Sequence, residues 1–331
     1  MRKFRRIEGG SYYSYLTEGC RLCRKGAKMV LFVTGKCPHS CYYCPVSDER
    51  RGRDVVYANE RFVENIDDVV DEILSMSAEG VAITGGEPLA SLERVLEYVE
   101  VFSRAGLHTH LYTSIFAGDL TLERLAESGL DEIRFHPPEL KNVWRYERPV
   151  KKARSLGMES GFEIPAVEYS FDVVEVVNES EAFLNVNELE FSTSNFKQLE
   201  SAGWKPGEFF EAAGSREIAG RYAESVEKFH FCSVRFKEIA QFRRRLIRMA
   251  FNMPEFYRVT SEGTVICGLL EGEREEIRKV LIQMGADFVE VDGGFEVDVE
   301  VAELLKDRFE ASIIERYPTH DRVVVEKHPL R

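Results

Sequence analysis

The sequence predicts an α/β protein built on a partial barrel of six β/α units, with a helical insertion and a small C-terminal α+β domain. From residue 29 to about residue 192, short β-rich runs alternate with stretches whose apolar residues recur at helical spacing. That alternation is typical of parallel strands joined by crossover helices. After Pro254 it changes to shorter strand and helix signals, which indicates a separate α+β region.

The expected barrel strands are rich in β-branched and apolar residues and end at polar or glycine-containing turns. They cover residues 29–34, 81–84, 108–113, 132–136, 161–164 and 188–191. Because parallel strands of a barrel all point the same way, the residues that follow them gather at one edge, where barrel enzymes place their active sites. Polar side chains just after these strands are therefore the first candidates for a site.

The chain divides into four expected parts: a basic N-terminal segment (1–28), the barrel (29–192), a locally basic helical segment (193–252) and the accessory domain (253–331). Between Lys228 and Arg248 there are seven Lys or Arg residues and one acidic residue, Glu238. A solvated helix face explains such a run most simply, and contact with RNA is the alternative.

Composition excludes several classes of protein. The chain has 331 residues, of which 44% are hydrophobic and 31% charged, enough to form a core and too mixed for wholesale disorder. No apolar run reaches the eighteen or so residues of a membrane span, so we expect a cytoplasmic protein with no membrane partner. The net charge of -13 disfavours non-specific binding to nucleic acid.

The cysteine pattern is the strongest chemical signal. Cys37, Cys41 and Cys44 stand in C-x3-C-x2-C spacing directly after the first expected strand. Structural zinc sites and ferredoxin-type clusters use four protein ligands, so three thiolates in one short loop leave one metal position open. The alternative, three free thiols without a metal, would crowd unpaired cysteines into a single loop.

A second motif follows the second strand, where Thr84-Gly85-Gly86-Glu87-Pro88 provides two glycines and a carboxylate. Together the two motifs resemble those of the radical S-adenosylmethionine (radical SAM) enzymes. The resemblance implies a [4Fe-4S] cluster on Cys37, Cys41 and Cys44, and S-adenosylmethionine (SAM) bound at the open iron. It also implies that Gly85, Gly86 and Glu87 contact the methionyl amino group. Standing alone, the second motif would be a plain strand-to-helix turn.

Other polar residues at the same edge are candidates for contact with the cofactor. Tyr43 matches the family's aromatic position before the third cysteine and is expected to pack on adenine. Ribose, carboxylate or substrate contacts are expected from Thr84, Thr113, Ser114 and Arg134. For each of these side chains, the alternative to contact with the cofactor or substrate is a purely structural role.

Four further cysteines form a candidate auxiliary site for zinc or a second iron-sulfur cluster: Cys20, Cys23, Cys232 and Cys267. The first two form a C-x2-C knuckle, which needs two more ligands. His230 is an alternative ligand, and a buried apolar role is the alternative for Cys267.

The leading functional prediction is a radical SAM enzyme that cleaves SAM reductively to a 5'-deoxyadenosyl radical, which abstracts hydrogen from a substrate. The resemblance implies an electron donor such as ferredoxin or flavodoxin. Outside the two motifs the chain is loosely similar to an archaeal-type group related to the pyruvate formate-lyase activating enzymes, so the substrate stays open between protein and tRNA. Basic residues at Arg2, Lys3, Arg5, Arg6, Arg21, Arg24, Lys25 and Lys28 favour tRNA. The alternative is a non-catalytic iron-sulfur or zinc protein for electron transfer or scaffolding.

Overall fold

The computed structural model describes residues 4–331 and separates them into two compact units. One consists of Met1–Val70 (described from residue 4) and Ala78–Phe242, the other of Asp71–Ser77 and Arg243–Arg331. Residues 71–77 belong to the second unit because Asn252 donates hydrogen bonds to the carbonyl of Ser75 and the hydroxyl of Ser77, at 2.9 and 2.8 Å. The four-part division expected from the sequence stays a prediction.

The first unit contains one mixed sheet, whose strands follow the order β1-β2-β11-β10-β9-β8-β7-β6-β3-β4-β5. Seven neighbouring strands, β3 and β6 to β11, are parallel. The strands are β1 (Arg5–Arg6), β2 (Tyr12–Tyr13), β3 (Lys28–Phe32), β4 (Tyr57–Ala58), β5 (Arg61–Phe62), β6 (Gly80–Thr84), β7 (His108–Thr113), β8 (Glu132–Phe135), β9 (Glu159–Pro165), β10 (Phe183–Asn187) and β11 (Lys228–Cys232).

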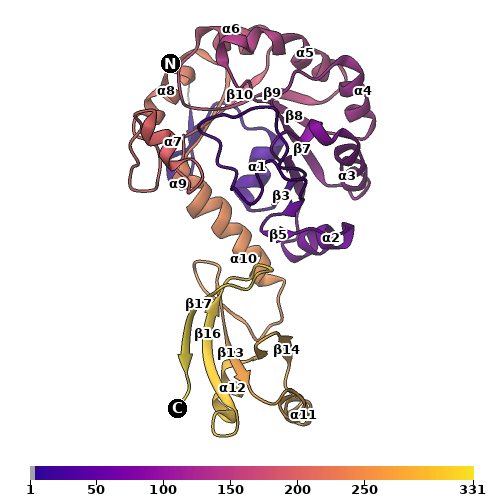
Figure 1. The fold of residues 1–331 in the computed structure, drawn as a ribbon, viewed down its shortest axis with the longest axis vertical. Coiled ribbons are helices and arrows are strands. Elements are labelled where there is room, and N and C mark those ends of the chain that lie inside the picture. Colours follow the sequence, from indigo (N-terminus) through magenta and orange to yellow (C-terminus); the bar gives the residue numbers. More distant parts are fainter. Residues whose placement is uncertain (1–3) are drawn as a thin grey trace. The chain divides into compact units, whose positions relative to one another are not determined.

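The helices of this unit precede, connect or follow the parallel strands. They are α1 (Glu18–Lys25), α2 (Ile66–Ser75, which crosses the unit boundary), α3 (Leu92–Arg104), α4 (Asp119–Glu127), α5 (Glu147–Ser155), α6 (Phe171–Glu179), α7 (Phe196–Ser201), α8 (Ser215–Ser225) and α9 (Val234–Phe236), with the 3-10 helices η1 (Glu8–Gly10), η2 (Pro88–Ser91) and η3 (Leu140–Tyr146) and the π-helix η4 (Lys237–Phe242). Figure 1 shows the strands curving around α1, with α3, α4, α5 and α6 on the outer side of the sheet.

Local sequence explains why α1 forms. The hydroxyl of Thr17 accepts a hydrogen bond from the backbone N–H of Cys20 at 3.2 Å and caps the start of the helix. Gly26 ends it in the left-handed conformation, with φ of 70°. The helix contacts the beginnings of β3, β6 and β7, and the backbone N–H of Gly19 donates to Glu132 of β8. It therefore fills the end of the barrel where the parallel strands start.

The predicted α/β class and partial barrel are confirmed, with two differences in the strands. The last expected strand, residues 188–191, is wrong: β10 occupies Phe183–Asn187. The segment expected to be helical from 193 to 252 also contains β11, which pairs in parallel with β10. The sequence pattern did not indicate these two strands because residue types that are depleted from strands occur there. They are Asn185 and Asn187 in β10 and the charged residues that flank β11.

The second unit is the small α+β domain that the sequence predicts. Its sheet follows the order β14-β15-β13-β16-β17, with β12 beside β13. Its elements are α10 (Arg243–Phe251), β12 (Arg258–Val259), β13 (Val265–Glu271), α11 (Arg274–Met284), β14 (Phe288–Val291), β15 (Gly294–Val297), α12 (Val299–Leu305), β16 (Glu310–Arg316) and β17 (Val324–Pro329).

Candidate active site

The three cysteines of the first motif lie on the loop between β3 and β4, at the end of the barrel opposite α1. Cys37 is exposed, whereas Cys41 and Cys44 are half-buried. Partial burial raises the pKa of the Cys37 and Cys41 thiols, and the neighbouring thiolates add to this rise. Three sulfur donors on one loop fit three corners of a cubane cluster.

The start of this loop is held by close backbone packing. Gly35 donates to the carbonyl of Arg53 and accepts from the N–H of Gly52, both at 2.8 Å. A Cβ on Gly35 would lie 1.7 Å from the carbonyl oxygen of Arg50. Only glycine allows the two segments to approach this closely.

The second motif is joined to the first through the backbone. Gly86 donates to the carbonyl of Thr34 at 2.7 Å, and Glu87 donates to the carbonyl of Lys36 at 2.8 Å. A Cβ on Gly86 would lie 2.5 Å from the Lys36 oxygen. The glycines therefore bring the end of β6, where Thr84 is the last residue, against the loop that carries the cysteines.

The side chain of Glu87 is 1% exposed and its oxygens are occupied by protein donors. Oε1 accepts from the backbone N–H of Leu89 at 3.0 Å and from the Thr113 hydroxyl at 2.8 Å. Oε2 accepts from the backbone N–H and the hydroxyl of Ser114. Three residues that the sequence singled out, Glu87, Thr113 and Ser114, thus meet, and the carboxylate ties the ends of β6 and β7 together.

Tyr43 is also fixed by its neighbours. His136 Nδ1 lies 3.0 Å from the carbonyl oxygen of Glu163. Since a carbonyl only accepts, Nδ1 carries the hydrogen and Nε2 accepts from the Tyr43 hydroxyl at 3.1 Å. Asn195 donates to the Tyr43 carbonyl at 3.0 Å, a contact that no sequence signal indicates. A cleft of about 160 Å³ lies beside Tyr43, lined by Tyr42, Pro137, Pro138, Leu140, Pro165, Val167 and Glu168.

Arg134 lies apart from this group, and its predicted contact with the cofactor stays a prediction. Its side chain is 2% exposed and lies under α1, where it forms ion pairs of 2.5 Å with Glu132 and Glu163. It also donates to the Thr17 hydroxyl at 3.0 Å. Because its donors are directed at buried protein groups, Arg134 anchors α1 inside the barrel.

The same interior contains a set of potential metal ligands. Within residues 4–331, His108, His110 and Glu132 are the one group of three or more such side chains whose ligand atoms lie within 4.8 Å of one another. Lys28 Nζ lies 2.5 Å from Nδ1 of His110 and 3.4 Å from Nδ1 of His108. Burial lowers the pKa of Lys28 to about 8. The chain's own amino group therefore contacts both imidazoles.

The four cysteines of the predicted auxiliary site lie on three elements of the two units, and that ligand set stays a prediction. Cys20 and Cys23 lie on α1, where Cys20 Sγ accepts from Arg134 and Asn185 at 3.4 and 3.3 Å. Cys232 ends β11. Cys267 is fully buried in an apolar cluster of the second unit with Val265, Leu269, Tyr257, Ala250 and Ile314, which matches its alternative role.

Comparison with known proteins shows the family of this chain. Residues 31–160 match the Radical SAM superfamily, and residues 263–330 match a domain of unknown function (DUF8061). The chain belongs to the radical SAM superfamily, whose members use a [4Fe-4S] cluster and SAM. It is 33% identical, over 96% of its length and 94% of the relative's, to the "Putative glycyl-radical enzyme activating enzyme MJ0021" of Methanocaldococcus jannaschii.

Solved structures show similar folds at low sequence identity. SuiB of Streptococcus suis bound to S-adenosylmethionine is 15% identical with a TM-score of 0.43, and SuiB bound to its precursor peptide SuiA is 14% identical with a TM-score of 0.40. The matches cover 62% of this chain and 50% and 48% of the SuiB chains, so this chain spans about half the length of those structures. Among the helices of residues 4–331, none has the length and apolar character needed to cross a bilayer.

Proposed function

We propose that this radical SAM enzyme abstracts a hydrogen atom from a glycine residue of a partner protein, as an activating enzyme of a glycyl-radical enzyme. The observation that carries the proposal is the junction of the two motifs, made by the hydrogen bonds from Gly86 to Thr34 and from Glu87 to Lys36. The printed name of the M. jannaschii relative, which resembles this chain over nearly its whole length, supports a protein substrate.

In this proposal Cys37, Cys41 and Cys44 hold the cluster, and Gly85 and Gly86 offer their backbone to the amino group of SAM. When bound together, the cluster and SAM supply the 5'-deoxyadenosyl radical. The chain's residues keep that chemistry in place: Glu87 fixes the ends of β6 and β7, and His136 fixes Tyr43. Helix α1 closes the far end of the barrel and excludes water from that side.

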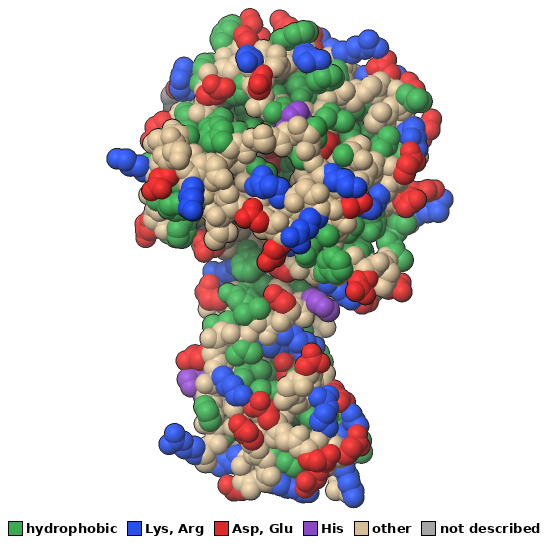
Figure 2. Space-filling model, viewed as in Figure 1, with side chains coloured by type: hydrophobic (Ala, Val, Ile, Leu, Met, Phe, Trp, Pro, Cys, Tyr) green, Lys and Arg blue, Asp and Glu red, His purple; other side chains and the backbone are tan. Residues whose placement is uncertain are grey.

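The state of the basic residues favours a protein substrate over tRNA. Arg21, Arg24 and Lys25 each form an ion pair, with Glu18, Glu8 and Glu79 at 3.1 Å. Lys28 is buried, and Arg2 and Lys3 lie outside the described residues. The exposed basic residues that remain of the set are Arg5 and Arg6 on β1. On the visible face of the larger unit, cations and anions are interspersed (Figure 2). Binding to a polyanion requires cations that are free to contact phosphates.

The partner that supplies electrons stays a prediction: a one-electron donor such as ferredoxin or flavodoxin. The rival function, a non-catalytic iron-sulfur or zinc protein, makes no SAM-derived product. The two are separated by giving SAM to anaerobically reconstituted, dithionite-reduced protein and assaying 5'-deoxyadenosine.

We expect the wild-type protein to form 5'-deoxyadenosine and Cys41→Ala to form none. Cys267→Ala is the matched control, because that thiol lies in the apolar core of the other unit, and it should retain the activity. Iron analysis should give about four irons per chain in wild type and in the control. Absence of the product from cluster-loaded wild-type protein would reject the proposal.

A further inference from the structure

Large apolar side chains are exposed just beyond the ends of two neighbouring parallel strands. Phe116 follows β7 by three residues and is 45% exposed, Leu120 in the first turn of α4 is 72% exposed, and Trp144 in η3, after β8, is 62% exposed. We call Phe116, Leu120 and Trp144 the rim patch. Exposed apolar residues that lie close together mark interaction sites, and aromatic residues are enriched in such sites.

The rim patch is directly connected to the candidate active site. Phe116 lies two residues after Ser114, whose backbone and hydroxyl donate to Glu87. The hydroxyl of Tyr146 donates to the carbonyl of Ser114, and the Tyr146 ring packs edge-on against Phe116, with centroids 5.7 Å apart. A molecule bound at the patch would therefore contact the same loop that holds Glu87.

The patch is also held in place at Phe116. The guanidinium carbon of Arg145 lies 4.0 Å from the centre of the Phe116 ring, in the geometry of a cation–π contact. Because Arg145 and Tyr146 hold the ring in place, little side-chain freedom would be lost on binding. Pre-ordered aromatic and arginine side chains are the usual anchors of protein interfaces.

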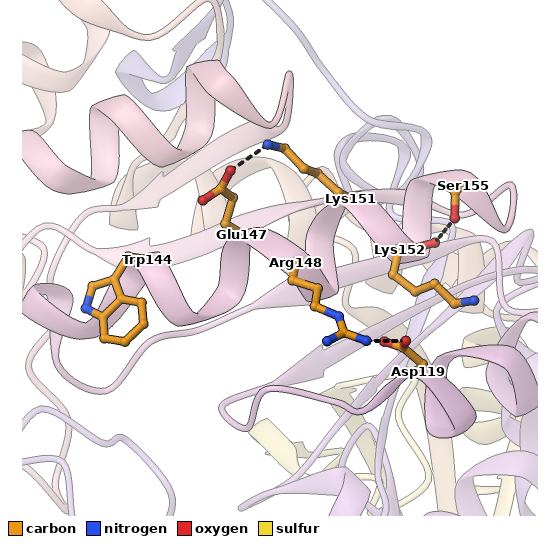
Figure 3. A pocket seen from close by; sticks show the side chains of 7 residues that line it. All are labelled: Asp119, Trp144, Glu147, Arg148, Lys151, Lys152 and Ser155. Carbon is orange, nitrogen blue, oxygen red and sulfur yellow. Dashed lines mark hydrogen bonds and ion pairs between the residues drawn. The ribbon is translucent and has the colours of Figure 1, made fainter.

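Beside Trp144 an open groove of about 500 Å³ runs between the start of α4 and α5. Figure 3 shows its charged side chains directed at one another, Arg148 toward Asp119 and Lys151 toward Glu147, both pairs at 2.5 Å. Lys152 is paired with Glu123 at 2.6 Å. The groove thus presents positive and negative side chains, paired with one another, beside an aromatic side chain.

We propose that the rim patch and this groove dock the protein partner, through a surface loop that has an apolar anchor flanked by charges of both signs. This inference rests on the proposed function and adds where the partner binds. Arg145 is engaged over the Phe116 ring and the cations of the groove are paired with carboxylates, which favours a protein surface over a phosphate backbone or an anionic membrane. A second copy of the chain bound here would lie beside its own active-site loop and obstruct access to it.

Photo-crosslinking tests the proposal. Trp144 is replaced by the photoreactive p-benzoylphenylalanine, and the protein is irradiated in an extract of the source organism. Val101, 41% exposed on α3, receives the same residue as the matched control. We expect position 144, and not position 101, to crosslink to one other protein, which is then identified by mass spectrometry and purified.

The purified partner supplies the decisive measurement. With wild-type enzyme, SAM and reductant, it should acquire a glycyl radical, detected as an electron paramagnetic resonance doublet because one α-hydrogen remains. Leu120→Asp should lower that rate roughly tenfold or more, while its formation of 5'-deoxyadenosine without the partner stays within about twofold of wild type.

Crosslinks to a second copy, to nucleic acid or to nothing would overturn the docking proposal, as would equal activation of the partner by Leu120→Asp. Its failure can be distinguished from failure of the proposed function. If wild type forms no 5'-deoxyadenosine, the function fails whatever the crosslinks show. If it forms that product but the rim variant activates the partner normally, only the docking site fails.

Discussion

Replacing Glu87 by glutamine tests whether its carboxylate acts as a clasp, that is, whether its hydrogen bonds hold the ends of β6 and β7 together. Both carboxylate oxygens of Glu87 face a backbone N–H, from Leu89 at 3.0 Å on one side and from Ser114 at 2.6 Å on the other. In Glu87→Gln one oxygen becomes an NH2 group, so in either orientation one backbone N–H faces a donor. The hydroxyls of Thr113 and Ser114 can rotate to accept, whereas a backbone N–H cannot.

A buried donor left without its acceptor costs about 1–3 kcal/mol, and the lost charge-assisted bonds add to this. We therefore expect the free energy of unfolding of the first unit to fall by about 2–4 kcal/mol. Both tryptophans, Trp144 and Trp204, lie in that unit, so tryptophan fluorescence during urea unfolding reports on it alone. The control Glu93→Gln removes a carboxylate that is 73% exposed and should leave the free energy of unfolding close to that of wild type.

The outcome also decides how Glu87 acts. If Glu87→Gln unfolds like wild type but binds SAM more weakly, the carboxylate contacts the ligand directly and the clasp interpretation is refuted. If stability and SAM binding fall together, while Glu93→Gln is unchanged, the carboxylate acts by positioning the ends of β6 and β7.

Two further predictions follow from the first unit. Gly86→Ala places a Cβ against the Lys36 carbonyl and should lower 5'-deoxyadenosine formation at least about tenfold. The control Gly118→Ala has open space around its Cβ and should leave the rate unchanged. Equal rates for the two variants would contradict the contact between the two motifs. Burial lowers the pKa of four histidines below the ordinary 6.5: His108, His110, His136 and His230. The folded state therefore favours the neutral form of each imidazole. The free energy of unfolding should fall as the pH drops below about 6.5, by up to about 1.4 kcal/mol per pH unit for each histidine. Urea unfolding followed by tryptophan fluorescence should give a lower free energy at pH 5.5 than at pH 7.5, and equal values would contradict this.

The sequence predicted the strand ends and glycine turns at this edge of the sheet well because short-range rules determine them. Strand β7 lies at His108–Thr113, as its β-rich pattern indicated. The turn residues after β3 and β6, Gly35 and Gly86, mark real close approaches of backbone. Motif spacing, strand ends and glycine requirements are local properties, so they can be read without knowing the tertiary structure.

The interior of the barrel could not be predicted in the same way. Arg134 follows a strand start by two residues and resembles any polar residue in a strand; its burial depends on α1, which is over a hundred residues away in the sequence. Gly19 marks that contact, because a Cβ there would lie 2.4 Å from His110 Nδ1. A single glycine in a helix, however, gives no indication of what it packs against.

The position of α1 has a consequence for how a substrate reaches the site. The barrel start is closed by a helix whose interface contains two cations, Lys28 and Arg134, and two anions, Glu132 and Glu163. Removing one member of a buried ion pair costs about 3–5 kcal/mol, so opening this end would expose charges that now compensate one another. Access is therefore expected only at the opposite end, where the cysteine loop and the rim patch lie. Under the proposed function, the partner's glycine enters there within a loop, and a docking surface beside the entrance would supply the binding energy needed to hold that loop in place.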